Sequence, residues 1–196
     1  MNAPPLILAS ASPRRVELLR EMGVAFVARP ARTAEISPEH LTPHEICQVN
    51  AYRKARAVAK QHPDDLVLGA DTIVCLGTRV FGKPATLAEA RAMLARLQGR
   101  THEVVTGVCL LHLRRHRQKI FAVSTTVTFR RLHAEQIRRY LARINPLDKA
   151  GGYAIQEGGD EIVKKISGSY SNVVGLPVEK LAEELALWEK VEGLKG

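Results

Sequence analysis

The chain has 196 residues, of which 45% are hydrophobic and 25% are charged, and its formal net charge is +9. This composition is ordinary for a globular protein and excludes a disordered chain, a collagen-like fibre and a mucin-like stalk. No apolar run approaches the roughly 18 residues that a membrane span requires, so we expect no membrane association. The short apolar run at 6–9 follows no basic segment, so we expect no signal peptide and a cytoplasmic location.

The three cysteines, Cys47, Cys75 and Cys109, are widely spaced and form no Cys-x-x-Cys pair. An odd number of cysteines at such spacings is untypical of a disulfide framework or a structural zinc site. We therefore expect three reduced, partly buried thiols that pack as small hydrophobic side chains.

The positive charge is concentrated in residues 114–143, where nine Lys/Arg residues accompany a single acid, Glu135. Such a segment is compatible with a surface that attracts nucleic acid or anionic small molecules. However, no ladder of aromatic residues for stacking on bases is interleaved with these charges. We therefore favour a solvated hairpin turn followed by the outer face of a helix, and we expect no nucleic-acid partner.

In the first half of the chain the pattern predicts two strands and two helices. The apolar run at 6–9 predicts a buried strand. Ser12 and Pro13 then predict the start of a helix over 12–23, capped by Ser12 and ended by Gly23. A capping box, Thr-Pro-His-Glu, opens a second helix over 42–59. The segment 66–76 is strand-like but is interrupted at 69–72.

The second half of the chain continues the alternation of helices and strands. A capping box, Thr-Leu-Ala-Glu, opens a helix over 86–99 that ends at a glycine. Val-, Thr- and Leu-rich segments at 103–113 and 120–129 flank a basic turn and predict a long hairpin. The remaining segments are a helix around 137–144, a loop-rich stretch over 145–176 and a final helix over 177–190. With no repeat or linker, the sequence predicts one α/β domain with a mixed sheet.

The first candidate site is the junction Ser-Ala-Ser-Pro-Arg-Arg at 10–15, between a strand and a helix. Unpaired backbone N–H groups at a helix start attract anions. Ser10 adds a hydroxyl donor, and Arg14 and Arg15 add guanidinium groups that match phosphate oxygens. The alternative, a capped helix with two exposed arginines, has similar weight on this segment alone.

The second candidate is Asp71, an acid within an apolar strand. A buried carboxylate must be paired, bind a metal or face an open cleft, so Asp71 is a candidate for holding a divalent cation or for accepting a proton from water. The alternative is a strand-end aspartate that makes a turn.

The segment 77–84 nearly matches the phosphate-binding loop Gly-x-x-x-x-Gly-Lys-Ser/Thr. We reject this interpretation because Pro84 stands where the loop needs a hydroxyl for magnesium. Lys83 remains a candidate phosphate contact as a point charge.

A fourth candidate is the glycine-containing segment 148–156, together with 167–172. Glycines let the backbone approach a ligand, and Gln156 has an amide able to read a base edge through two hydrogen bonds. Taken alone, these segments are better explained as two tight connections. Glu35 supplies a second carboxylate and Lys54 a further cation, so the chain carries the residue types that bind a metal–polyphosphate.

Five motifs occur in order: Leu-Ala-Ser-Ala-Ser-Pro-Arg-Arg at 8–15, Leu-Gly-Ala-Asp-Thr-Ile-Val at 68–74, Lys83-Pro84, Asp-Lys-Ala-Gly-Gly-Tyr-Ala-Ile-Gln at 148–156 and Gly-Ser-Tyr-Ser-Asn-Val-Val-Gly-Leu-Pro at 168–177. Together they closely resemble the Maf family of nucleoside triphosphate pyrophosphatases. The resemblance covers nearly the whole chain and implies a single Maf-like domain over 1–196.

This resemblance implies an α/β fold like that of inosine triphosphate pyrophosphatases, with an elongated mixed sheet flanked by helices and two lobes around a cleft. It also implies hydrolysis of a nucleoside triphosphate to the monophosphate and pyrophosphate, a divalent cation (Mg²⁺ or Mn²⁺) and a homodimer. The motifs are similar to those of the branch that acts on dTTP and UTP. A modified pyrimidine nucleotide, in a house-cleaning role, is an alternative substrate.

The family's functional residues carry over to matching positions of this chain. Asp71 would accept the proton and, with Glu35, hold the metal, while Arg14, Thr72 and Gln156 would select the base. The residues that would line the phosphate and metal site also include Ser10, Arg15, Lys54 and Lys83.

The chain departs from the family pattern at a few positions. Arg32 and Thr33 stand where an acidic residue is usual, and Arg53 stands where Glu is frequent. Gly152 replaces the usual Ala, and Glu157 replaces Gly next to the expected base-reading glutamine. A rival hypothesis is a nucleotide- or nucleic-acid-binding regulator, linked to cell division, with little catalysis.

Overall fold

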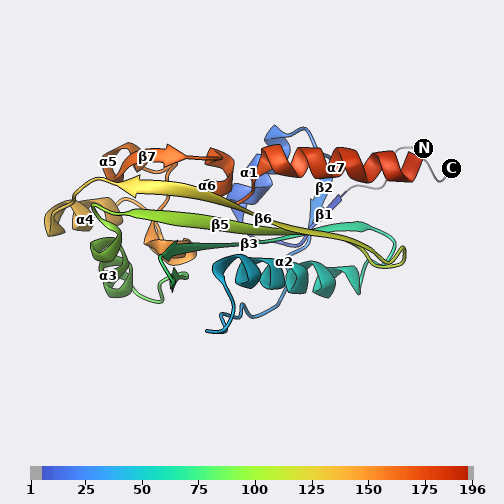
Figure 1. Ribbon diagram of the computed structural model, residues 1–196, viewed down its shortest axis with the longest axis horizontal. Helices are drawn as coiled ribbons and strands as arrows, with labels where there is room; N and C mark the ends of the chain where they lie inside the picture. The colour runs from blue at the N-terminus through green and yellow to red at the C-terminus, as the bar shows by residue number, and fades with distance from the viewer. Residues whose placement is uncertain (1–5, 194–196) are drawn as a thin grey trace.

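The computed structural model describes residues 6–193, which form a mixed, seven-stranded sheet with helices on both faces (Figure 1). The strands follow the order β2-β1-β3-β5-β6-β7, and β4 pairs with β3. Their bounds are β1 Leu6–Leu8, β2 Phe26–Ala28, β3 Leu66–Leu76, β4 Arg79–Phe81, β5 Thr101–His112, β6 Arg117–Phe129 and β7 Val163–Ser167. The long β3, β5 and β6 run antiparallel and give the molecule its elongated shape.

The helices lie on the two faces and at one end of this sheet. Their bounds are α1 Pro13–Glu21, α2 Pro43–Ala59, α3 Leu87–Leu97, α4 Ala134–Leu141, α5 Gly159–Ile162, α6 Tyr170–Val174 and α7 Val178–Gly193, with 3₁₀ turns η1 at Pro146–Asp148 and η2 at Ala150–Gly152. In Figure 1, α2 lies on one face, α1 and α7 lie on the other, and α3 and α4 lie at the end away from the two termini.

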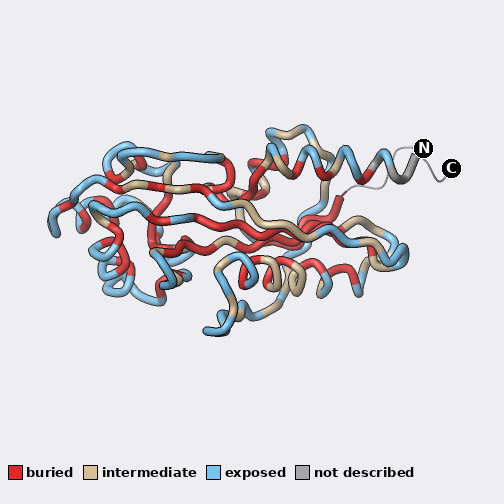
Figure 2. The backbone as a smooth tube through the Cα atoms, viewed as in Figure 1, coloured by how far each residue is buried: buried red, intermediate tan, exposed pale blue. Residues whose placement is uncertain are grey.

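Alternation along the strands explains why both faces of the sheet are buried. Leu68 and Ala70 of β3 pack in the same cluster as residues of α1 and α7, whereas Val67 packs with Ala51 and other residues of α2. Successive strand side chains point to opposite faces, so one apolar strand serves two layers. The predominantly red β3 and β5 in Figure 2 show this core.

Two glycines bring α2 unusually close to the sheet. A Cβ added at Gly69 would lie 2.2 Å from the Ala51 carbonyl oxygen, and one added at Gly107 would lie 2.3 Å from the Cys47 carbonyl carbon. Gly107 is also the cross-strand partner of Asp71. Because only glycine permits this approach, α2 is held directly over Asp71.

The strand pairing leaves an opening beside Asp71. On one edge, β3 pairs with β1 at Val67 and Leu68 and with β4 from Val74 to Leu76. Between these two short partners, the described strands leave the edge at 69–73 uncovered, while β5 pairs along the other edge. The cleft described below is lined by residues from this part of β3.

The expected mixed sheet flanked by helices is confirmed, as are the hairpin formed by β5 and β6 and the capping box at Thr42 and Glu45. The expected interruption of the strand at 69–72 is wrong, because β3 is continuous. Ser12 occupies the cap position of α1, but its side chain makes no capping hydrogen bond. The loop-rich stretch at 145–176 contains a strand, β7, as well as α5 and α6.

The basic segment 114–143 does not form one surface. Its first charges lie on the turn of the β5–β6 hairpin and its last on α4, at opposite ends of the molecule (Figure 1). The guanidinium of Arg117 stacks 3.9 Å from the Trp188 ring centroid, and Lys119 pairs with the buried Glu184 at 3.3 Å. Arg138 of α4 pairs with Glu135, and Arg143, just after α4, pairs with Glu161.

The three cysteines are free and buried, as Cys47, Cys75 and Cys109 all lie in the core. Burial raises the pKa of Cys47 to about 12 and that of Cys75 to about 11. These thiols are therefore protonated at neutral pH and pack as apolar groups. Within residues 6–193 no helix is long and apolar enough to cross a membrane.

Candidate active site

A single cleft of about 360 Å³ brings the candidate residues together. Its lining includes residues from the end of β1, the start of α1, the loop before α2, α2 itself, β3, the segment after η1 and the end of α6. All the residues singled out from the sequence line it: Ser10, Arg14, Arg15, Glu35, Lys54, Asp71, Thr72, Lys83 and Gln156. Segments that are far apart in the chain thus converge on one concave site, as ligand sites do.

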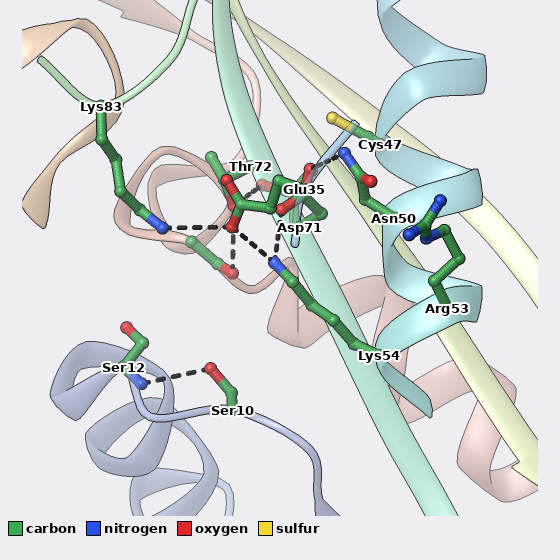
Figure 3. Close-up of polar contacts among 12 residues, drawn as sticks. Ser10, Ser12, Glu35, Cys47, Asn50, Arg53, Lys54, Asp71, Thr72 and Lys83 are labelled. Carbon is green, nitrogen blue, oxygen red and sulfur yellow. Dashed lines mark hydrogen bonds and ion pairs between the residues drawn. The ribbon is translucent and has the colours of Figure 1, made fainter. Parts of the chain in front are cut away.

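Four charged side chains form a chain of ion pairs at this cleft (Figure 3). The Lys54 ammonium lies 2.6 Å from Oδ1 of Asp71 and 2.8 Å from Oε1 of Glu35. Lys83 lies 3.1 Å from the same oxygen of Glu35. The Asp71 side chain is 4% exposed, whereas that of Lys83 is 52% exposed, so the chain runs from the protein interior to solvent.

The two carboxylates have opposite pKa shifts. Burial raises the pKa of Asp71, and the charge of Glu35 adds to this, against the opposing charge and hydrogen bond of Lys54. For Glu35, burial also disfavours the charged form, but the hydrogen bonds and charges of Lys54 and Lys83 together lower its pKa to about 2. A pair of acids whose environments separate their pKa values is typical of catalytic sites.

Arg15 closes one wall of the cleft and is itself buried. Its Nε donates to the Gly175 carbonyl at 2.8 Å, its Nη1 to Ser10 Oγ at 3.2 Å and its Nη2 to Thr72 Oγ1 at 3.0 Å. The Thr72 hydroxyl also lies 3.0 Å from the hydroxyl of Thr106. Arg15 therefore ties β1, β3 and the turn after α6 together with a fixed positive charge.

Arg14 and the exposed Gln156 also line the cleft. Arg14 donates to the Asp148 carboxylate at 3.3 Å and to its carbonyl at 3.2 Å. The buried Lys149 pairs with Asp148 at 3.0 Å and with Glu157 at 3.2 Å. The departure from the family pattern at position 157 thus supplies an ion pair to Lys149, beside Gln156.

Sequence reasoning missed Asn50, which is 2% exposed and donates to Oδ2 of Asp71 at 3.1 Å. Its carboxamide also bonds to both backbone groups of Ile36. One signal was available, because Asn50 lies four residues before Lys54 and so shares its face of α2.

The donor set of the cleft fits a divalent cation that is bound together with phosphates. Glu35 and Asp71 direct carboxylate oxygens at one cationic group, the Lys54 ammonium. Within residues 6–193, no cluster of three or more His, Cys, Asp or Glu side chains is arranged to hold a metal. Mg²⁺ commonly binds through one or two carboxylates, with substrate phosphates and water as its other ligands, so two are sufficient.

Comparison with known proteins gives consistent matches. A family model described as Maf-like protein matches residues 5–188. A dTTP/UTP pyrophosphatase of Moorella thermoacetica is 49% identical over 93% of this chain and 94% of the relative. One from Exiguobacterium sibiricum is 48% identical over 92% of this chain and 91% of the relative.

Among solved structures, a HAM1 protein from Coxiella burnetii is 22% identical, with a TM-score of 0.48 over 65% of this chain and 74% of that chain. The family model and the curated relatives, by contrast, cover almost the full sequence, and they establish that the chain belongs to the Maf family.

Proposed function

We propose that this protein hydrolyses dTTP and UTP to the nucleoside monophosphate and pyrophosphate. The observation that carries the proposal is the ion-paired series Lys83, Glu35, Lys54 and Asp71 in a cleft that also contains Arg14 and Gln156. The curated relatives that match over more than nine-tenths of the chain are named dTTP/UTP pyrophosphatase, which supports this substrate class.

In the proposed reaction, a water molecule attacks the α-phosphorus. The new bond joins the water oxygen to phosphorus, the bond between the α-phosphorus and the bridging oxygen breaks, and pyrophosphate leaves. Asp71 accepts the proton that the water loses. Its raised pKa, caused first by burial, makes the carboxylate a stronger base than an exposed aspartate.

The cations of the cleft have a separate role from the base. Lys54 and Lys83 neutralise the charge that develops on the phosphoryl oxygens, and Ser10 and Arg15 line the phosphate side. Among the other lining residues, Arg14, Thr72 and Gln156 select the base. Thr72 is held by Arg15 and Thr106, so we propose that it shapes the cleft from a fixed position.

Glu35 and Asp71 are the residues that would hold a Mg²⁺ or Mn²⁺ ion. When bound, such an ion supplies charge neutralisation on the polyphosphate, which lowers the cost of releasing pyrophosphate. The Lys54 ammonium already lies between the two carboxylates and would share them with the ion or shift toward the phosphates.

The test is pyrophosphate release from dTTP, UTP, CTP, ATP, GTP and 7-methyl-GTP, each with Mg²⁺, with Mn²⁺ and with a chelator. Metal-dependent release from dTTP and UTP alone is the expected result. Release from 7-methyl-GTP instead would overturn the base assignment and keep the reaction. No release by a folded protein would favour a binding regulator or a modified pyrimidine nucleotide as the substrate.

The proposal also includes the domain organisation, the oligomeric state and the cellular location of the protein. We propose that residues 1–196 act as one domain, that the protein is a homodimer and that it works in the cytoplasm. The single domain and the homodimer are carried by the family resemblance rather than by a contact in the cleft. Light scattering on the purified protein tests the dimer, and cell fractionation tests the location.

A further inference from the structure

Asn50 hydrogen-bonds to Asp71, as Figure 3 shows, and to the backbone of Ile36, the residue that follows Glu35. We propose that Asn50 is a positioning residue that holds Glu35 and Asp71 in one fixed geometry. This inference rests on the proposed function and deepens it, because it assigns a residue that controls both proposed metal ligands without being one itself.

The loop that carries Glu35 is held in place by Asn50. Residues 29–42, between β2 and α2, form no helix or strand, so strand or helix hydrogen bonds do not place Glu35. Instead, Asn50 Oδ1 accepts from the Ile36 N–H at 2.9 Å, and Asn50 Nδ2 donates to the Ile36 carbonyl at 2.9 Å. The carboxamide thus pairs with the residue after Glu35 as a neighbouring strand would.

The same carboxamide of Asn50 also contacts Asp71. Nδ2 has two hydrogens, one directed at Ile36 and the other at Oδ2 of Asp71, 3.1 Å away. A reversed amide would set its oxygen against two acceptors, so the hydrogen bonds determine its orientation. Asp71 is therefore held at both ends, with Oδ2 on Asn50 and Oδ1 on Lys54.

Asn50 stands on a rigid support, the helix α2. Asn50 is 2% exposed, so water competes little for its hydrogen bonds. Its helix, α2, packs tightly against the sheet, because the α2 backbone at Cys47 and Ala51 lies directly on Gly107 and Gly69. One buried amide on a fixed helix therefore sets the distance between the Glu35 loop and β3.

The test compares wild type with Asn50→Leu, which has a similar size but no hydrogen bonds. Hydrogen exchange of the Ile36 amide reports the tether, since this N–H is bonded to Asn50. Electron paramagnetic resonance measures Mn²⁺ binding to the substrate-free protein. We expect loss of Ile36 protection and a 10- to 100-fold loss in Mn²⁺ affinity and kcat, the range typical for partners of metal ligands, with a smaller change in KM.

A matched control is Arg53→Ala. Arg53 reaches the same loop, with Nη2 3.4 Å from the Ala34 carbonyl, but the contact is exposed. This variant should keep Ile36 protection and kcat near wild type. Asn50→Leu with lost protection but unchanged Mn²⁺ affinity and kcat would overturn the proposal, and so would unchanged protection.

If Asn50→Leu does not fold, Ile36→Pro removes the same hydrogen bond from the loop side and leaves α2 intact. An unchanged kcat in this variant would contradict the tether. If wild type hydrolyses no nucleotide, the proposed function fails, whereas Ile36 exchange and Mn²⁺ binding still decide the role of Asn50.

Discussion

The ammonium of Lys54 lies 2.6 Å from Oδ1 of Asp71, and both side chains are largely removed from solvent. Isolated, either charge would be costly to bury, because a desolvated ion loses its hydration. Together with Glu35 they form a compensated group at an opening in the sheet edge. Lys54 thus opposes the rise in the Asp71 pKa that burial causes, which favours the charged carboxylate that the proposed reaction needs.

Replacement of Asp71 by asparagine tests this role directly. The amide keeps the shape of the side chain but accepts no proton, so we expect turnover to fall by roughly 100-fold or more. Lys54 retains Glu35 as a partner, and a buried charge is removed, so the melting temperature should stay level or rise. Steady-state pyrophosphate release and thermal unfolding measure the two effects. Near-normal turnover would remove Asp71 from the mechanism.

The fold was predictable where periodic patterns are long. The hairpin of β5 and β6 and the capped helix α2 produce strong signals in the sequence, whereas the glycine and aspartate within β3 hid its continuity. β2 and β4 have three residues each, too few to show a period, and β7 carries Lys164 and Lys165. Only their neighbours in the sheet make these segments strands.

The site was predictable where motifs carry it, but its connections were not. Asp71 and Lys83 stand in recognisable segments, and both line the cleft. Asn50, by contrast, is a single asparagine in a helix, and its role arises from Ile36 and Asp71, which approach it only in the folded chain. The sequence pattern shows that Asn50 and Lys54 share one face of a helix, but it does not show which residues pack against that face.

Base selection is tested by Gln156→Ala. The proposed amide contacts to the pyrimidine edge contribute about 0.5–1.5 kcal/mol each, so their loss should raise the KM for UTP about 10-fold. The ratio of kcat/KM for UTP to that for CTP should fall, whereas kcat changes little. Glu161→Gln, which alters an exposed pair with Arg143 instead, is the control. An unchanged UTP/CTP ratio in Gln156→Ala would refute the assignment.

The close approach of α2 is tested by Gly107→Ala. The added methyl would lie 2.3 Å from the backbone of Cys47, so the helix or the strand must shift. Such overpacking typically costs about 1–3 kcal/mol, and the shift should also lower turnover because α2 carries Lys54. Chemical denaturation measures the loss of stability.

The control for this variant is Gly82→Ala, since a Cβ there meets no atom within 4 Å. It should change the free energy of unfolding by no more than about 0.5 kcal/mol. Equal stability of the two variants would show that the sheet and α2 tolerate a wider separation than the structure has.

The buried side chain of His102 should make the stability of the protein depend on pH. His102 is buried in contact with Phe129 and Tyr153, and its Nε2 lies 2.7 Å from the Tyr153 hydroxyl. Burial lowers the pKa of His102 to about 4, from 6.5. Between these values the unfolded chain binds a proton that the folded protein does not. The contribution of His102 to stability is therefore fully present above pH 6.5 and decreases as the pH falls below it.

From these values, His102 alone should remove about 2 kcal/mol of stability between pH 7.5 and pH 5.0. His102→Gln keeps a hydrogen-bonding partner for Tyr153 but does not titrate, so its unfolding free energy should decline less over this range. Carboxylates contribute equally to both proteins, and the difference between the two slopes therefore isolates His102. Urea unfolding at the two pH values gives that difference, and parallel slopes would mean that His102 is not held neutral by burial.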